Sequence, residues 1–172
     1  MRIVPLRLAV LLVVVAALAG CASTGATPAP FPRPGIAGAP APPDAAGAVS
    51  TSGYVVTGTA LALRGTRYRD GGGDPSGFDC SGFVWYVFGQ HGIALPRTVS
   101  EQYQSGIAVS VDRLEPGDLV FFSTVKPGAS HVGIALGGDE FVHAPSEHGE
   151  VRVERLSSSY WSSRFVGARR VL

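Results

Sequence analysis

Three side chains of this 172-residue chain have the chemical types needed for nucleophilic catalysis: Cys80, His131 and His143. An imidazole that takes the proton of a thiol leaves a thiolate, which is the reactive nucleophile. A second imidazole, hydrogen-bonded to the far nitrogen of the first, can fix its tautomer and orientation. We therefore expect Cys80 to be a nucleophile, His131 its general base and His143 the residue that orients His131.

The chain has only two cysteines, and the other one, Cys21, follows an export signal. A lone thiol in an oxidising compartment is either buried and inert or kept because it reacts. Two alternatives stay open: Cys80 as a small buried hydrophobe, and a zinc site made of Cys80, His131 and His143. These three residues are 51 and 12 positions apart. Structural zinc sites usually contain close ligand pairs, so we expect no metal and no cofactor.

Residues 1–20 are organised like a secretory signal peptide. Arg2 and Arg7 precede an apolar stretch that is too short to span a bilayer comfortably. The signal ends in Leu18-Ala19-Gly20-Cys21, which resembles the bacterial lipobox, whose acylated cysteine becomes the first residue of the mature chain. We expect a lipid anchor on Cys21 that holds the protein to a membrane of the cell envelope. The alternatives are ordinary cleavage nearby and an uncleaved N-terminal membrane anchor.

Residues 21–53 are mostly Ala, Gly, Pro, Ser and Thr, with too few large apolar side chains for a core. This segment is therefore expected to be a disordered tether. Residues 54–172 are enough for one domain. Loss of residues 1–20 removes two of the 14 basic residues and leaves 12 against 13 acidic ones. This balance implies no nucleic-acid partner, and we expect a monomer.

Helices are expected in the first part of the domain. The apolar stretch 54–63 predicts a helix closed by Gly65. Apolar residues at three- and four-residue spacing predict a second helix from Cys80 to about residue 90, with Asp79 as its N-cap. Unpaired amides at a helix start favour an anion, so we expect a lowered pKa for the Cys80 thiol, and its backbone amide facing an oxyanion. A capping box at 98–101 predicts a short third helix.

Strands are expected after residue 107, in the segments 119–123, 131–136, 140–144, 151–154 and 165–172. Helices followed by an antiparallel sheet form an α+β fold. A hairpin centred on Gly137 would place His131 and His143 directly opposite each other, on the sheet face that the Cys80 helix packs against. A two-residue turn at Gly137-Gly138 would instead put them on opposite faces. The site therefore requires an odd-length loop or a β-bulge.

A series of short motifs runs through the domain in a fixed order. They are Tyr68-Arg69, Gly71-Gly72, Phe78-Asp79-Cys80-Ser81-Gly82-Phe83, Leu95-Pro96-Arg97-Thr98, Pro116-Gly117-Asp118-Leu119-Val120-Phe121-Phe122, Ser130-His131-Val132-Gly133-Ile134 and Phe141-Val142-His143-Ala144. Together they resemble the NlpC-type papain-like cell-wall cysteine peptidases over essentially all of residues 54–172. The resemblance implies the same roles for Cys80, His131 and His143.

The resemblance also implies a substrate, namely peptide bonds in peptidoglycan stems, usually beside D-glutamate or diaminopimelate. Tyr68 matches a tyrosine whose hydroxyl assists at the oxyanion, and Asp79, Ser81 and Arg97 match positions that line the substrate groove. Two other functions stay open: a non-catalytic envelope lipoprotein that binds peptidoglycan, and acyl or amide transfer by the same thiolate. Ala22 after Cys21 is compatible with the outer membrane, facing the periplasm, in a diderm bacterium.

Overall fold

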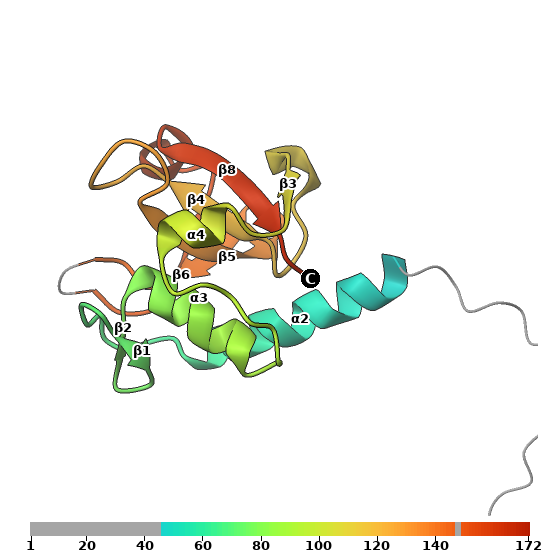
Figure 1. Cartoon of the computed structure of the whole chain (residues 1–172). Helices are drawn as coiled ribbons and strands as arrows, with labels where there is room; N and C mark the ends of the chain where they lie inside the picture. The colour runs from blue at the N-terminus through green and yellow to red at the C-terminus, as the bar shows by residue number, and fades with distance from the viewer. Residues whose placement is uncertain (1–45, 147–148) are drawn as a thin grey trace, which may run out of the picture. The chain divides into compact units, whose positions relative to one another are not determined.

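The computed structural model describes residues 46–146 and 149–172, which lie within one compact unit, Pro42–Leu172. Its centre is a six-stranded antiparallel sheet with the order β3-β8-β4-β5-β6-β7 (Figure 1). The strands are β3 (Ile107–Val109), β4 (Leu119–Phe122), β5 (His131–Gly137), β6 (Glu140–His143), β7 (Arg152–Arg155) and β8 (Phe165–Arg170). The expected signal peptide, Cys21 and the tether before residue 46 lie outside the described residues.

The helices are α2 (Ala46–Ala62), α3 (Cys80–Gly89), α4 (Val99–Tyr103) and α5 (Ser159–Ser162), with a 3-10 turn η1 (Val111–Arg113). A small hairpin, β1 (Gly73–Asp74) and β2 (Gly77–Phe78), comes just before α3. Helices followed by an antiparallel sheet confirm the α+β prediction. None of the helices within 46–146 and 149–172 is long and apolar enough to cross a membrane.

The expected boundary between tether and domain is wrong by eight residues, because α2 begins at Ala46 and not at Tyr54. At Gly53 the helix runs so close to the turn before β4 that a Cβ atom would lie 1.9 Å from the Pro116 carbonyl oxygen. A shortage of large apolar side chains suggested disorder here, but alanine is the strongest helix former and glycine permits this contact. The helix ends as predicted, with Gly65 in the left-handed region at φ 85°.

The two helix starts that the sequence predicts are both present. Asp79 is the N-cap of α3, and its carboxylate accepts a hydrogen bond of 2.6 Å from the Gly82 amide. Thr98 caps α4 in the same way by accepting from the Glu101 amide. Each cap satisfies a backbone N–H that has no partner inside its helix, which is why α3 begins at Cys80.

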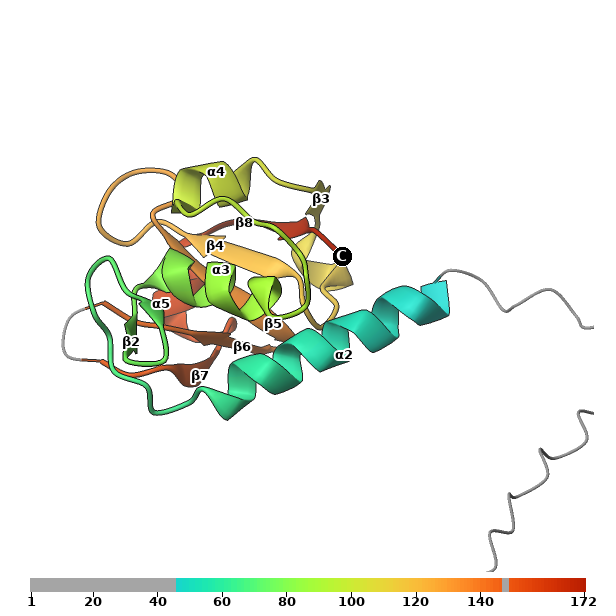
Figure 2. The same cartoon turned by 60° about the horizontal axis from the view of Figure 1, so that its bottom comes forward.

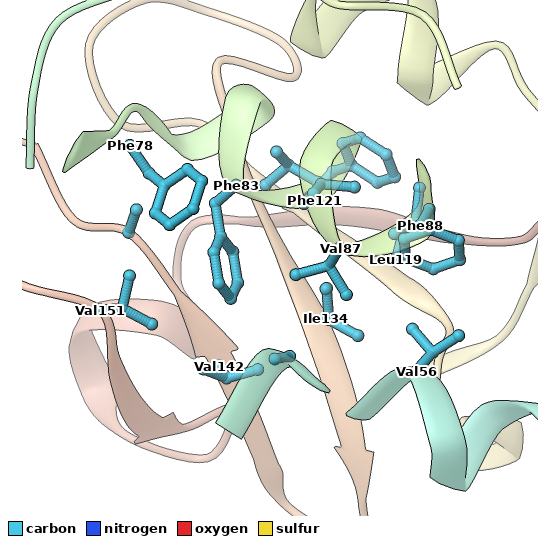
Figure 3. Close-up of a cluster of buried hydrophobic side chains, with 14 residues drawn as sticks. Val56, Phe78, Phe83, Val87, Phe88, Leu119, Phe121, Ile134, Val142 and Val151 are labelled. Carbon is cyan, nitrogen blue, oxygen red and sulfur yellow. The ribbon is translucent and has the colours of Figure 1, made fainter. Parts of the chain in front are cut away.

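Helices α2 and α3 cover one face of the sheet (Figures 1 and 2). Between them and the strands lies a cluster of fully buried apolar side chains, shown in Figure 3. Phe83 and Val87 of α3 meet Ile134 of β5 and Val142 of β6 in this cluster. We call this side of the sheet the helix face.

The other side of the sheet packs against the chain around α5. Its buried cluster contains Val120, Phe122, Ala135, Phe141, Leu156, Trp161 and Ala168. Side chains alternate between the two faces along a strand, so Val132 and Ile134 point to the helix face while His131 and Ala135 point the other way. We call this second side the histidine face.

The β5–β6 hairpin contains the β-bulge that the site requires. Its turn is the two residues Gly138 and Asp139, because Gly137 pairs with Glu140. Ala135 pairs with Phe141, so the register shifts and Leu136 is an extra residue on β5. Continuation of this register by one residue places His143 opposite Gly133 and not opposite His131. The two histidines share a face as predicted, but they are diagonal neighbours and not a direct pair.

Candidate active site

Cys80 is the first residue of α3, and its side chain packs against the core cluster of the helix face. The backbone N–H groups of Ser81 and Val132 act on the sulfur and lower the pKa of the thiol against the effect of burial. Val132 is the residue after His131 in β5. The contact with Val132 therefore places the thiol at the end of β5 where His131 begins the strand.

The pKa of the Cys80 thiol is raised to about 11, which is the opposite of the direction that its helix-start position predicts. Burial is the largest cause, and the negative charge of Asp79 adds to it. Hydrogen bonds from the backbone amides of Ser81, Val132 and Cys80 itself oppose the rise without cancelling it. The resting thiol is therefore protonated at neutral pH. The sequence indicates the helix start, which favours an anion, but it does not indicate how closely the sulfur is packed.

The two histidines form a directly bonded pair. His131 Nε2 lies 2.8 Å from His143 Nδ1, and both rings are buried, with 5% and 0% exposure. Burial lowers the pKa of His131 to about 4, although the negative charge of Glu154 acts to raise it. Burial and the charges of His131 and Arg152 lower the pKa of His143 to about 2. Both rings are therefore neutral at pH 7. Since Nε2 of His131 faces His143, its Nδ1 is the nitrogen left for a proton from elsewhere.

His131 and His143 lie on the histidine face, against Trp161. The Trp161 indole stacks on His131 at 5.5 Å between ring centroids and meets His143 edge-on at 5.0 Å. The expectation that His131 lies on the face covered by the Cys80 helix is therefore wrong. Cys80 is the first residue of α3 and His131 is the first residue of β5.

Gly133 makes the diagonal pair possible. A Cβ atom at this position would lie 2.6 Å from Phe141 Cδ2 and 3.2 Å from the Cβ of His143. The first of these separations is shorter than real Cβ contacts, so a side chain here would displace one of the two rings. The missing side chain lets His131 and His143 meet across the strand.

Two polar cavities border this site. One, of about 300 Å³, is lined by Thr124, His131, Pro145, Ser146, Arg152, Glu154, Tyr160 and Trp161. The other, of about 540 Å³, is lined by Arg67, Tyr68, Gly149, Glu150 and Arg152. Arg152 is common to both. His131, the candidate base, therefore lines the smaller cavity, which can hold polar groups of a ligand.

Comparison with known proteins identifies the family. Residues 65–170 match the model of the NlpC/P60 family. The chain belongs to the NlpC/P60 family. It is 45% identical over 111 residues to the "Probable peptidoglycan endopeptidase LytE" of Bacillus subtilis, covering 64% of this chain and 32% of LytE.

Two further relatives agree with this assignment. The "Murein DD-endopeptidase MepS/Murein LD-carboxypeptidase" of Escherichia coli K12 is 44% identical over 110 residues, which cover 63% of this chain and 57% of that protein. The chain thus spans between a third and somewhat over half of these two curated relatives. The crystal structure of an NlpC/P60 protein from Bacillus cereus superposes with a TM-score of 0.66 at 32% identity, over 70% of this chain and 40% of that one.

Asp79, Ser81 and Arg97, the predicted groove residues of this NlpC/P60 domain, form one network at the start of α3. The Arg97 guanidinium binds both oxygens of Asp79, at 2.9 and 2.6 Å, and donates to Ser81 Oγ at 3.0 Å. A further hydrogen bond of 3.0 Å joins Arg97 to the Gly72 carbonyl. Asp79 raises the pKa of Arg97 through these contacts. The network holds the helix start that carries Cys80, and its contact with a substrate stays a prediction.

Tyr68 lies half-buried beside the core cluster of the helix face, and its backbone N–H donates to the Gly149 carbonyl at 2.8 Å. Its side chain lines the larger cavity next to Arg152. The NlpC/P60 domain thus carries this tyrosine at a cavity wall, and its role at an oxyanion stays a prediction.

The sequence indicated no functional role for Trp161, Gly133 or Glu154. Each contributes to the surroundings of the histidine pair in this NlpC/P60 domain. Trp161 lies in a serine-rich segment, residues 157–163, and a large apolar ring in such a polar segment could have indicated that it covers a site. No three His, Cys, Asp or Glu side chains gather into a metal-binding group within the part of the chain that the structure describes.

Proposed function

We propose that this chain is a cysteine peptidase that hydrolyses peptide bonds in peptidoglycan. Cys80 is the nucleophile, His131 the general base and His143 the residue that orients His131. The hydrogen bond of 2.8 Å between His131 Nε2 and His143 Nδ1 carries the proposal, because it reserves the other nitrogen of His131 for proton transfer. The relatives support the substrate class, since LytE is named a peptidoglycan endopeptidase and MepS a murein endopeptidase.

The first step forms a covalent intermediate. The Cys80 sulfur attacks the carbonyl carbon of the scissile bond while His131 Nδ1 takes the thiol proton. The amides of Cys80 and Ser81 belong to the first turn of α3, where N–H groups have no carbonyl partner within the helix, so we propose that they turn from the resting sulfur to the developing oxyanion. The imidazolium then gives its proton to the leaving amine, and the acyl group remains on sulfur as a thioester.

Water completes the reaction. His131 takes a proton from a water molecule that attacks the thioester, and returns it to the sulfur as the acid product leaves. The raised pKa of Cys80 and the lowered pKa of His131 make the resting pair neutral. Proton transfer therefore accompanies the attack on the carbonyl, in place of a thiolate–imidazolium pair formed in advance.

Hydrolysis of purified peptidoglycan tests the function. We expect the full-length protein to release soluble peptides, and the Cys80→Ala variant to release none. The masses of the products identify the bond, which we propose is D-glutamyl-diaminopimelate or D-alanyl-diaminopimelate. Intact peptidoglycan after prolonged incubation with wild-type protein, together with co-sedimentation of protein and wall, would favour a non-catalytic binding protein.

The same product masses separate hydrolysis from group transfer. Hydrolysis adds one water to the cleaved bond, whereas resolution of the thioester by an amine adds that amine. We expect the water product even when a second amino compound is present in excess. A product that carries the added amine would identify an acyl transferase with the same site.

We also propose that the chain is held at the cell envelope by a lipid on Cys21, which places the domain near its substrate. The motif Leu18-Ala19-Gly20-Cys21 supports this proposal. Metabolic labelling with a palmitate analogue should mark the wild-type protein and not a Cys21→Ala variant. Equal labelling of both would rule out Cys21 as the acylated residue.

A further inference from the structure

Glu154 of β7 lies on the same face of the sheet as the two histidines. It pairs with Phe141, and Arg152 pairs with His143, so both charged residues of β7 point to the histidine face. The Glu154 carboxylate has two donors: Arg152 Nε at 2.6 Å from Oε1, and the Trp161 indole N–H on Oε2. These contacts hold the carboxylate in one orientation.

The oriented carboxylate faces a buried ring nitrogen of the histidine pair that has no hydrogen-bond partner. His143 Nε2 is buried and lacks a hydrogen-bond partner in the structure, and Glu154 Oε1 lies 3.7 Å from it. Most buried polar atoms have a hydrogen-bond partner, so a buried nitrogen without one is unusual. Its neighbour offers oxygen lone pairs only, so a proton on Nε2 is favoured and a bare nitrogen there is opposed.

The position of that proton determines every other proton in the pair. A neutral His143 with its hydrogen on Nε2 has a bare Nδ1, which can only accept. His131 Nε2 must then donate the hydrogen of the 2.8 Å bond, and the neutral His131 ring has its lone pair on Nδ1. The reverse arrangement would leave a hydrogen on Nδ1 of His131, and that ring would be unable to take a proton there.

We propose that Glu154 is a positioning residue that fixes the tautomers of His143 and His131, so that Nδ1 of His131 is free to act as the base. This inference rests on the proposed function, in which His131 accepts the thiol proton. Glu154 acts through His143 and need not touch the substrate. Its negative charge also compensates the positive charge that His131 acquires during attack, consistent with Glu154 raising the pKa of His131 against the effect of burial.

Substitution of Glu154 by glutamine keeps nearly the same shape but replaces one of the two acceptor oxygens with an NH2 donor. Arg152 Nε and the Trp161 indole can both only donate, so a glutamine can accept from just one of them. Trp161 is buried, whereas Arg152 is half exposed and can turn to solvent, so the amide oxygen will stay with the indole at the place of Oε2. The amide NH2 group then faces His143 Nε2 and favours a bare nitrogen there. Both rings are expected to switch to the tautomer with hydrogen on Nδ1.

Long-range proton–nitrogen NMR of the ¹⁵N-labelled full-length protein measures these tautomers directly. We expect hydrogen on Nε2 of both rings in the wild type and on Nδ1 of both rings in Glu154→Gln. Spectra of His131→Gln and His143→Gln assign the signals among the four histidines of the chain. The kcat of Glu154→Gln should fall about ten- to a hundredfold, the range seen when the partner that orients a histidine is removed from a metal site.

Glu140→Gln is the matched control, because Glu140 is an exposed glutamate on the adjacent strand β6. It should leave both the tautomers and kcat at their wild-type values. Unchanged tautomers in Glu154→Gln, or an unchanged kcat in spite of switched tautomers, would overturn the inference. The NMR result needs no substrate, so absence of hydrolysis by the wild type would refute the proposed function and leave the tautomer assignment to be decided separately.

Discussion

The two faces of the central sheet differ in what they bury. The helix face holds an apolar cluster in which Phe83 and Val87 of α3 meet Ile134, without a charged member. The histidine face buries Phe122, Phe141 and Trp161 together with two imidazoles, next to the half-buried carboxylate of Glu154. Apolar burial stabilises the fold, whereas buried polar groups must be hydrogen-bonded or they destabilise it. We therefore expect the helix face to contribute mainly stability and the histidine face to hold the base, with Cys80 packed against the helix face.

Substitution of His131, the proposed base, should have the largest effect and tests the difference between the two faces most directly. We expect His131→Ala to lower kcat at least about 10⁴-fold, because the neutral thiol then has no proton acceptor. The free energy of unfolding at neutral pH should change much less than the activation free energy. Peptidoglycan hydrolysis and urea unfolding of the same preparation provide the two measurements. Residual activity within tenfold of wild type would refute the role of His131.

Truncation on the helix face should have the reverse effect. Phe83→Ala removes a fully buried ring, and we expect about 3–5 kcal/mol less stability. The kcat of the molecules that remain folded should stay within a few-fold of wild type. Trp85→Ala, on the exposed side of the same helix, is the control and should cost less than about 1 kcal/mol. Equal losses of stability from both would contradict the burial of Phe83.

Gly133→Ala should affect stability and activity together on the histidine face, because the new methyl group meets Phe141 and His143 there. We expect a loss of about 1–3 kcal/mol from overpacking and at least about a tenfold fall in kcat from the displaced imidazole. Gly58→Ala is the control, since a Cβ there meets open space in α2, and it should stabilise by about 0.5–1 kcal/mol. Wild-type kcat in Gly133→Ala would show that the histidine pair tolerates a side chain between its members.

The last effect concerns pH and is confined to the histidine face. The pKa of His143 is lowered in the folded protein to about 2, so the unfolded chain, near 6.5, binds its proton first as the pH falls. Stability is therefore complete above about pH 6.5 and declines below it, by up to about 1.4 kcal/mol per pH unit for each such histidine. Urea unfolding at about pH 7.5 and about pH 5 measures this decline. His143→Asn should show a smaller decline than wild type, and an equal one would refute the linkage.

Local signals in the sequence predicted much of this arrangement. Asp79 and Thr98 are N-cap residues whose hydrogen bonds involve amides only three positions away, so the starts of α3 and α4 required no knowledge of tertiary contacts. The β5–β6 hairpin was predictable for the same reason, because side chains alternate between the two faces along a strand. A bulge was one of two ways to place His131 and His143 on one face, and the structure contains that bulge.

The remaining features depend on contacts between distant segments. The role of Glu154 requires the β6–β7 register, which follows a connection of eight residues that no turn motif fixes. The raised pKa of Cys80 depends on how tightly α3 packs against β5, and a helix start alone predicts the opposite direction. The close approach of α2 to Pro116 at Gly53 likewise joins segments that are far apart in the sequence.

The bulge at Leu136 has a genetic consequence. Loss of the codon for this residue would remove the bulge, and the strands would still pair Gly137 with Glu140 and Ala135 with Phe141, so the two imidazoles would keep their alignment. A second codon lost from the same strand would find no bulge to absorb it, and one histidine would turn to the other side of the sheet. We therefore expect the histidine alignment to survive loss of Leu136 and to be broken by loss of a second residue between His131 and Ala135.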